Sequence, residues 1–205
     1  MNTLIELIRT VWDYLGQMAV LAVPAAVAFL CITPYRCRSL TAIGLRSGLT
    51  REVGMILFVM TVFSILAVTL RPPMGWGSPL PSRGGDPWDN VNLIPFRMFR
   101  IYKAYYGWGK YIYIIINFLG NMLVFLPLGF FPALLFRRER WWRSVLVGGG
   151  ISVFVEFGQY FLMRQSDIDD VILNTIGALC GFWVFLLLKR FIPGLVSKIR
   201  CQTIS

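Results

Sequence analysis

One glutamate lies in the middle of an apolar run, and several polar residues follow it closely. The run is Ser144–Leu162, and Glu156 is the only acidic or basic residue in it. A charge at the centre of a bilayer costs about 2.5–3.5 kcal/mol on insertion scales, so such residues are rare and usually functional. Since the chain has no histidine, Ser-His-Asp and Cys-His catalysis are excluded, and proton transfer must use carboxylates. The polar residues that follow are Gln159, Arg164, Asp167, Asp169 and Asp170.

The three aspartates have a structural as well as a functional interpretation. Asp167, Asp169 and Asp170 precede a second apolar run, Val171–Leu188. At a helix N-terminus, carboxylates accept hydrogen bonds from free amides and favour the helix dipole, and Ser166-x-x-Asp169 fits a capping box. One helix start seldom needs three carboxylates beside an arginine. We therefore expect one aspartate to be a cap and the others to serve a site.

Polar side chains on three predicted helices reach a similar depth. With a rise of about 1.5 Å per residue, Glu156 and Asn117 lie about 9 Å below the outer ends of their runs, and Asn174 lies about 6 Å below its own. Asn121 shares a helix face with Asn117. We predict one connected polar cluster. The structural alternatives are an ion pair with Arg164 or a protonated carboxyl for Glu156, and hydrogen bonds between helices for the asparagines.

The composition indicates a membrane protein. The 205 residues are 57% hydrophobic, with a mean hydropathy of +0.65. Apolar runs of about 18 or more residues predict membrane-spanning helices. We predict an all-α, polytopic membrane helix bundle of about five transmembrane helices, forming a single domain over residues 1–205. The third is expected to kink at Pro127 and Pro132. The predicted spans are Tyr14–Ile32, Val53–Leu70, Tyr111–Phe136, Ser144–Leu162 and Val171–Leu188.

The basic residues predict the orientation of the bundle. Most of the 20 Lys and Arg residues fall in segments that share one side if the N-terminus is outside. Cytoplasmic loops are rich in Lys and Arg, so we predict an outside N-terminus and a cytoplasmic C-terminus. The net charge of +10 then reflects topology and affinity for membrane lipid, and nucleic-acid binding is not expected. The basic residues concerned are Arg36, Arg38, Arg46, Arg51, Arg137, Arg138, Arg140, Arg143, Lys189, Arg190, Lys198 and Arg200.

A long extracytoplasmic loop, Arg71–Lys110, connects the second and third spans. Its first half is rich in Gly and Pro, which forbids regular structure. Its second half alternates aromatic and basic residues at helical spacing, which is typical of an interfacial amphipathic helix. Arg97, Arg100 and Lys103 would form a lipid-facing basic segment, although a membrane-resting aromatic belt is the alternative. The cysteines, two in spans and two on the cytoplasmic side, indicate neither a disulfide framework nor a metal site, and no cofactor is expected.

Several short motifs occur in a fixed order along residues 90–181. They are N-L-I-P-F at Asn92–Phe96, N-x-x-x-F-x-P-x-G from Asn121, E-x-x-Q from Glu156, Arg164, and D-I-D-D-V-I-L-N-T-I-G at Asp167–Gly177. In this order the motifs resemble the VanZ-like membrane-protein family, named for a teicoplanin-resistance protein. The resemblance implies an integral membrane protein of a family linked, in some members, to lowered sensitivity to lipoglycopeptide antibiotics.

Three functions are compatible with these residues. The one we favour is a non-catalytic protein of the bacterial cytoplasmic membrane that binds membrane lipid, a lipid-linked cell-wall precursor or a glycopeptide antibiotic at the outer leaflet. The second is a membrane enzyme on a lipid-linked substrate, with Glu156 and Asp167, Asp169 or Asp170 as acid and base, although no nucleophile or phosphate loop stands out. The third is a small lipid transporter, which five spans without a repeat fit poorly. The candidate binding residues are Asn92, Asn117, Asn121, Glu156, Gln159, Arg164, Asp167, Asp169, Asp170 and Asn174.

Overall fold

The computed structural model describes residues 2–73, 88, 90–97, 100, 111–136, 139–200 and 202–203, and their side chains except those of 2–11, 111–114, 116–117 and 202–203. Five of the helices in this part of the chain are long and apolar enough to cross a membrane, which confirms the predicted all-α membrane bundle. The helices are α1 (Asn2–Ala42), α2 (Leu49–Thr69), α4 (Tyr111–Leu135), α5 (Trp141–Phe161), α6 (Ile168–Phe191) and α7 (Pro193–Ile199). Four two-residue strands accompany them, β1 (Leu45–Arg46), β2 (Val91–Asn92), β3 (Ser166–Asp167) and β4 (Gln202–Thr203).

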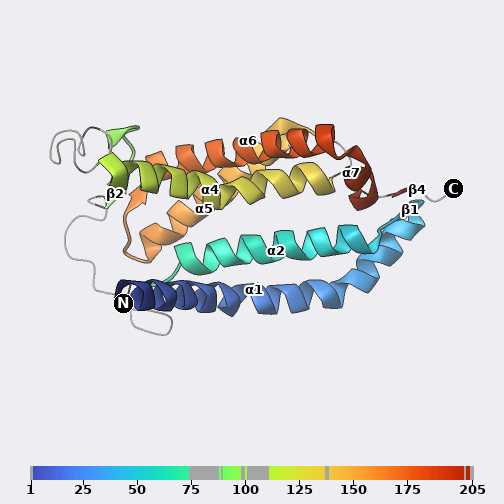
Figure 1. Cartoon of the computed structure of the whole chain (residues 1–205), viewed down its shortest axis with the longest axis horizontal. Coiled ribbons are helices and arrows are strands. Elements are labelled where there is room, and N and C mark those ends of the chain that lie inside the picture. Colours follow the sequence, from blue (N-terminus) through green and yellow to red (C-terminus); the bar gives the residue numbers. More distant parts are fainter. Residues whose placement is uncertain are drawn as a thin grey trace.

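The long helices run along one axis, and the two chain ends lie at opposite ends of the bundle (Figure 1). We call the end that holds β2 and the α5–α6 turn the loop end, and the end that holds β1, β4 and α7 the tail end. An odd number of spans requires the segments before the first and after the last to lie on opposite sides. The five spans predicted from the apolar runs therefore agree with the position of the two chain ends at opposite ends of the bundle.

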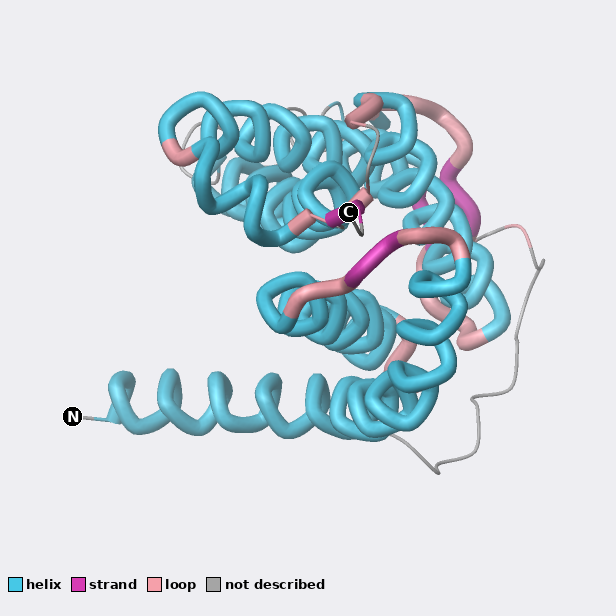
Figure 2. Tube along the Cα trace, turned by 90° about the vertical axis from the view of Figure 1, so that its right-hand side faces the viewer, coloured by secondary structure: helices cyan, strands magenta, loops and turns pink. Residues whose placement is uncertain are grey.

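The first helix is longer than its apolar run predicted. The predicted span was Tyr14–Ile32, but α1 begins at Asn2 and continues through Pro24 and Pro34 to Ala42. Figure 2 shows the first turns of α1 leaving the bundle sideways, whereas the rest of α1 runs along α2. The apolar run predicts which residues lie within the membrane, but a helix can continue beyond the apolar run. The helical segments before and after the predicted span carry the charged residues of α1, which are Glu6, Arg9, Asp13, Arg36 and Arg38.

Close backbone contact joins α4 to α6. A Cβ atom on Gly177 would overlap the backbone of Met122, and one on Gly181 would overlap the carbonyl oxygen of Leu126. On the α4 side, Gly129 meets the backbone of Ala178 in the same way. Small residues allow transmembrane helices to approach closely and gain van der Waals contact. The glycines in the motifs therefore have a packing role, because they hold together the two helices that carry Asn121 and Asp170.

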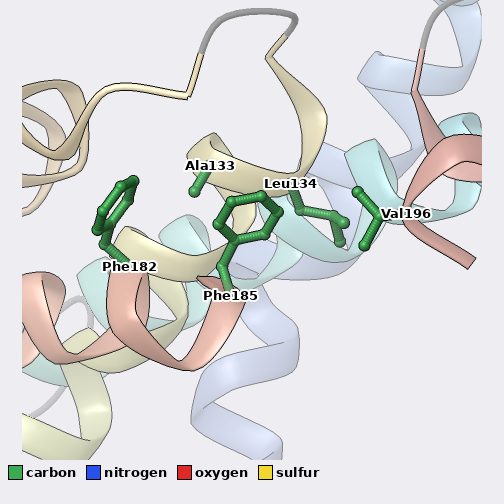
Figure 3. Close-up of a cluster of buried hydrophobic side chains, with 5 residues drawn as sticks. All are labelled: Ala133, Leu134, Phe182, Phe185 and Val196. Atoms are coloured by element: carbon green, nitrogen blue, oxygen red, sulfur yellow. The ribbon is translucent and has the colours of Figure 1, made fainter. Parts of the chain in front are cut away.

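The main apolar core lies toward the tail end. Phe182 and Phe185 of α6 pack against Ala133 and Leu134 of α4 and Val196 of α7 (Figure 3). These side chains are buried from both water and lipid. The core holds α7 against the tail end of the bundle (Figure 1).

An ion cluster lies beside this core. Glu139, in the loop between α4 and α5, accepts a 2.7 Å bond from Lys189 and pairs with Arg200 at 2.6 Å. Burial raises the pKa of Glu139, but the hydrogen bonds and positive charges of Lys189 and Arg200 outweigh it, so its pKa lies below the ordinary value. β1 pairs with β4 in antiparallel fashion and ties the C-terminal residues to the α1–α2 connection.

Candidate functional site

A two-residue strand of the long loop is bound to the turn between α5 and α6. β2 and β3 pair in parallel, with Val91 opposite Ser166 and Asn92 opposite Asp167. The amide of Ser166 also donates to the carbonyl oxygen of Asn90 at 2.9 Å. The pairing joins segments about 75 residues apart in the chain. It places the N-L-I-P-F motif directly on the aspartate-rich start of α6.

Asp167 connects three segments of the loop end. Its Oδ1 accepts a bond from the amide of Asp169 at 2.9 Å and another from Nδ2 of Asn92 at 2.7 Å. Its own amide donates to Oε2 of Glu156 at 2.7 Å. Asp167 is therefore the N-cap of α6, and the predicted capping box that began at Ser166 is wrong by one residue. The reason is that the backbone of Ser166 is engaged in the β2–β3 pairing.

The second aspartate holds the other end of the N-L-I-P-F motif. The amide of Phe96 donates to Oδ1 of Asp169 at 2.5 Å, and Oδ1 of Asn92 accepts from the amide of Ile94 at 3.1 Å. Phe96 has φ of 60°, in the left-handed region that bulky residues rarely adopt. The bond to Asp169 holds the amide of Phe96 in this conformation. The side chains of Asn92 and Asp169 thus bind backbone amides at the two ends of the motif.

The third aspartate joins α6 to α4. Nδ2 of Asn121 donates to Oδ1 of Asp170 at 2.6 Å, and both side chains are half-buried. The side chain of Asn117, which was predicted to belong to the same cluster, lies outside the described residues. Asp167 and Asp169 therefore bind the two ends of the N-L-I-P-F motif, Asp170 binds α4, and only Asp167 is the N-cap.

Gln159 and Arg164 lie in a separate group. Nε2 of Gln159 and Nη1 of Arg164 both donate to the carbonyl oxygen of Thr69, at 3.1 and 3.0 Å, and Nη1 also reaches the carbonyl of Arg71 at 3.3 Å. These donors satisfy carbonyl groups at the C-terminus of α2 that have no partner within the helix. Within the described part of the chain, no ion pair joins Arg164 to Glu156. That structural alternative for Glu156 is therefore wrong.

Asn174 lies in a further small group between α5 and α6. Its Nδ2 donates to Oγ of Ser152 at 2.9 Å, and both residues are buried. Its Oδ1 is buried without a hydrogen-bond partner in the described structure. Ser152 precedes Glu156 by one helical turn, so its position on the same helix face could have been found from the sequence. The hydrogen bonds of the predicted cluster are thus divided among several separate groups.

A pocket of about 380 Å³ opens beside Glu156. Glu156 and Asp167 are 6% and 7% exposed, and the lining also includes the hydroxyl-bearing Ser166 and Tyr160 and the indole of Trp88. The remaining lining residues are apolar, and two of them, Val153 and Phe157, are more than half exposed on the outer face of α5. Small-molecule sites are commonly concave, mostly apolar and of about 300–1,000 Å³, with a few placed polar groups. The lining residues are Trp88, Val91, Leu93, Val153, Glu156, Phe157, Tyr160, Ser166, Asp167, Ile168 and Val171.

This arrangement can hold an apolar chain and a hydrogen-bond donor at the same time. The walls provide apolar surface, and the two carboxyl groups accept hydrogen bonds or exchange protons. No group of three or more Cys, Asp or Glu residues in the described part of the chain lies suitably to hold a metal ion. The predicted basic segment is described only in part. Arg97 and Arg100 are exposed at the loop end, while Lys103 lies outside the described residues.

The fold and its polar loop end define a multi-pass membrane protein with a buried carboxyl group beside an apolar pocket. The family model described as VanZ/LLP1 matches residues 53–189, and the chain belongs to this family. No curated protein and no solved structure matches this chain. The match begins in α2, earlier than the motifs found in the sequence. It therefore includes Thr69 and Arg71, whose backbone carbonyls bind Gln159 and Arg164 and which no side-chain motif could indicate.

Proposed function

We propose that this protein binds an amphiphile in the pocket beside Glu156, at the outer leaflet of a bacterial cytoplasmic membrane. By holding an envelope lipid, a lipid-linked cell-wall precursor or the lipid tail of the drug, it would lower sensitivity to lipoglycopeptide antibiotics such as teicoplanin. The protein would act by binding rather than by catalysis. A hydrocarbon chain would fill the apolar part of the pocket, and a donor group would meet Glu156.

The main support for this proposal is the pocket beside Glu156. Its apolar walls continue into the exposed apolar surface of α5, so a lipid chain can enter from the membrane without crossing water. Its polar groups are fixed before any ligand binds, since the amide of Asp167 orients Glu156 and Asn92 orients Asp167. Preorganised polar groups reduce the entropy lost on binding.

The distribution of charge supports an outer-leaflet position. Arg36 pairs with Glu52 in the first turn of α2, beside Arg51, and Lys189 and Arg200 lie at the ends of α6 and α7. These element ends form the tail end, while the aspartates lie at the start of α6, at the loop end (Figure 1). Basic residues favour the cytoplasmic side. The loop end, and the pocket with it, would then face the side on which glycopeptides meet lipid-anchored precursors.

Antibiotic susceptibility of a host that expresses the chain tests the proposal. We expect a higher inhibitory concentration for teicoplanin and a smaller change for vancomycin, which lacks the lipid tail. Val153→Trp, which fills the pocket, should remove the effect. Phe154→Trp is the matched control, because Phe154 is similarly exposed on α5 and does not line the pocket. Equal protection by both variants, in comparable amounts in the membrane, would contradict binding in this pocket.

One observation favours acid–base catalysis as a second function. Two carboxyl groups, Glu156 and Asp167, line the same pocket together with the hydroxyl of Ser166. A positioned carboxyl group can transfer a proton to or from a bound lipid-linked substrate. Mass spectrometry of membrane lipids with and without the chain separates the two functions. A product that requires Glu156 would indicate an enzyme, and unchanged lipids with retained protection would indicate binding.

A further inference from the structure

A second pocket, of about 440 Å³, lies at the loop end between α1 and α2. It shares none of its lining residues with the pocket beside Glu156. Arg71 directly follows α2, and Arg164 reaches it from the α5–α6 turn. The lining residues are Tyr14, Gln17, Val68, Arg71, Pro72, Pro73 and Arg164.

The polar side chains that line this pocket include two positive charges and several hydrogen-bond donors. Arg71 and Arg164 carry guanidinium groups, and Tyr14 and Gln17 line the same pocket with a hydroxyl-bearing and an amide-bearing side chain. None of the described lining residues is acidic. Like charges at one site repel each other, and an anion between the two arginines would remove this repulsion. The chemistry of the pocket therefore selects a negatively charged ligand.

Arg164 is held in position before any ligand binds. Its Nη1 donates to the carbonyl oxygens of Thr69 and Arg71 at 3.0 and 3.3 Å. The guanidinium group is planar and carries five N–H donors in a fixed fork. Among the described residues the hydrogen bonds of Arg164 all use Nη1, which leaves the donors of Nε and Nη2 for an acceptor in the pocket. Arg71 is exposed, and its side chain can close on the ligand from the other side.

The pocket lies at the depth of lipid headgroups. Trp12 and Tyr14 are 69% and 49% exposed near the start of the α1 span, and such aromatic residues mark the interface between membrane and water. Arg71 lies just beyond the end of the α2 span. Phosphate groups of lipids occupy this level, and arginine binds phosphate through two parallel hydrogen bonds.

We propose that this second pocket is a phosphate-binding site formed by Arg71 and Arg164, with Tyr14 and Gln17 as further donors. The phosphate comes from a lipid headgroup or from free phosphate. The site is separate from the pocket beside Glu156 and does not depend on the function proposed for it. It joins α1, which packs mainly on α2, to the turn that carries the aspartates.

Binding of three probes to the purified, delipidated full chain in detergent tests this site. The probes are phosphatidylglycerol, diacylglycerol with the same acyl chains, and inorganic phosphate. Arg71→Gln removes the positive charge and replaces the five N–H donors of the guanidinium group with the two of an amide, so it should weaken phosphatidylglycerol binding about tenfold or more. Tyr14→Phe should weaken it about threefold. The matched control is Arg97→Gln, because Arg97 is an exposed arginine of the same end that does not line the pocket.

The three probes identify the source of the phosphate. Tight binding of phosphatidylglycerol, with weak binding of inorganic phosphate, indicates a headgroup. Equal binding of both indicates that phosphate alone is recognised. In either case the loss must follow Arg71→Gln and not Arg97→Gln. Equal affinities of these two variants, or diacylglycerol binding as tightly as phosphatidylglycerol, would overturn the proposal.

Discussion

Replacing Asp167 by alanine should release the long loop and weaken the start of α6 together. Its side chain accepts the amide of Asp169 as the N-cap and Nδ2 of Asn92 at 2.7 Å. Asn92 is 4% exposed, so water does not readily replace the lost acceptor. The backbone amide that binds Glu156 is unaffected by the substitution. The change therefore removes two bonds and leaves the third.

The expected cost is the sum of these two losses. Removing an N-cap costs about 1 kcal/mol, and removing a charged acceptor from a buried donor costs about 1.5–3 kcal/mol. Asp167→Ala should then lower the free energy of unfolding by about 2.5–4 kcal/mol. Asp167→Asn should cost less than about 1 kcal/mol, because asparagine caps as well as aspartate and its oxygen can still accept from Asn92.

Reversible unfolding of the purified protein in mixed micelles, titrated with a denaturing detergent, measures these values. Asn92→Ala and the double variant complete a thermodynamic cycle, and the two residues should show a coupling of about 1–3 kcal/mol. Asp13→Ala is the control, because this exposed carboxylate should change stability by less than about 0.5 kcal/mol. Effects of Asp167→Ala and Asn92→Ala that simply add would refute the contribution of their hydrogen bond.

Three further predictions concern packing, pH and orientation. Gly181→Ala, whose Cβ would overlap a backbone oxygen of α4, should cost about 1–3 kcal/mol in the same unfolding assay, whereas Gly150→Ala, with open space around it, should cost little. The pKa of Glu139 is lowered in the fold, so its contribution to stability is complete above the ordinary glutamate pKa and is lost as pH falls through the lowered value. Glu139→Gln should therefore reduce the loss of stability in acid, and an unchanged pH profile would contradict this. Reporter fusions after Ser205 and within Gly75–Gly85 should report opposite sides, with the first cytoplasmic, and a cytoplasmic signal from the second would overturn the orientation.

Hydropathy was sufficient to predict the bundle, because each span must cover the bilayer with apolar residues. It could not predict the length of α1, since a helix does not end where its apolar run ends. Asp167 was expected at the start of α6, but its role as the N-cap depends on a strand pairing with residues about 75 positions earlier. Local patterns contain no information on that pairing.

Depth along a helix was easier to predict than direction around it. Glu156 and Arg164 belong to the same loop end, but Glu156 meets the amide of Asp167 and Arg164 meets the end of α2. The rise per residue gives the level of a side chain, while the rotation of each helix depends on its neighbours. The partner of Arg164 is a backbone carbonyl, which every residue carries, so the sequence could not identify it.

The pairing of β2 with β3 also sets an order of assembly during synthesis. The chain leaves the ribosome from its N-terminus, so Asn92 is made about 75 residues before Asp167, the acceptor of its Nδ2 group. The carbonyl groups of Thr69 and Arg71 likewise meet the side-chain donors of Gln159 and Arg164 only after these later residues have been inserted. The loop end can therefore close only when α5 and the start of α6 have entered the membrane, which makes its completion a late event in biogenesis.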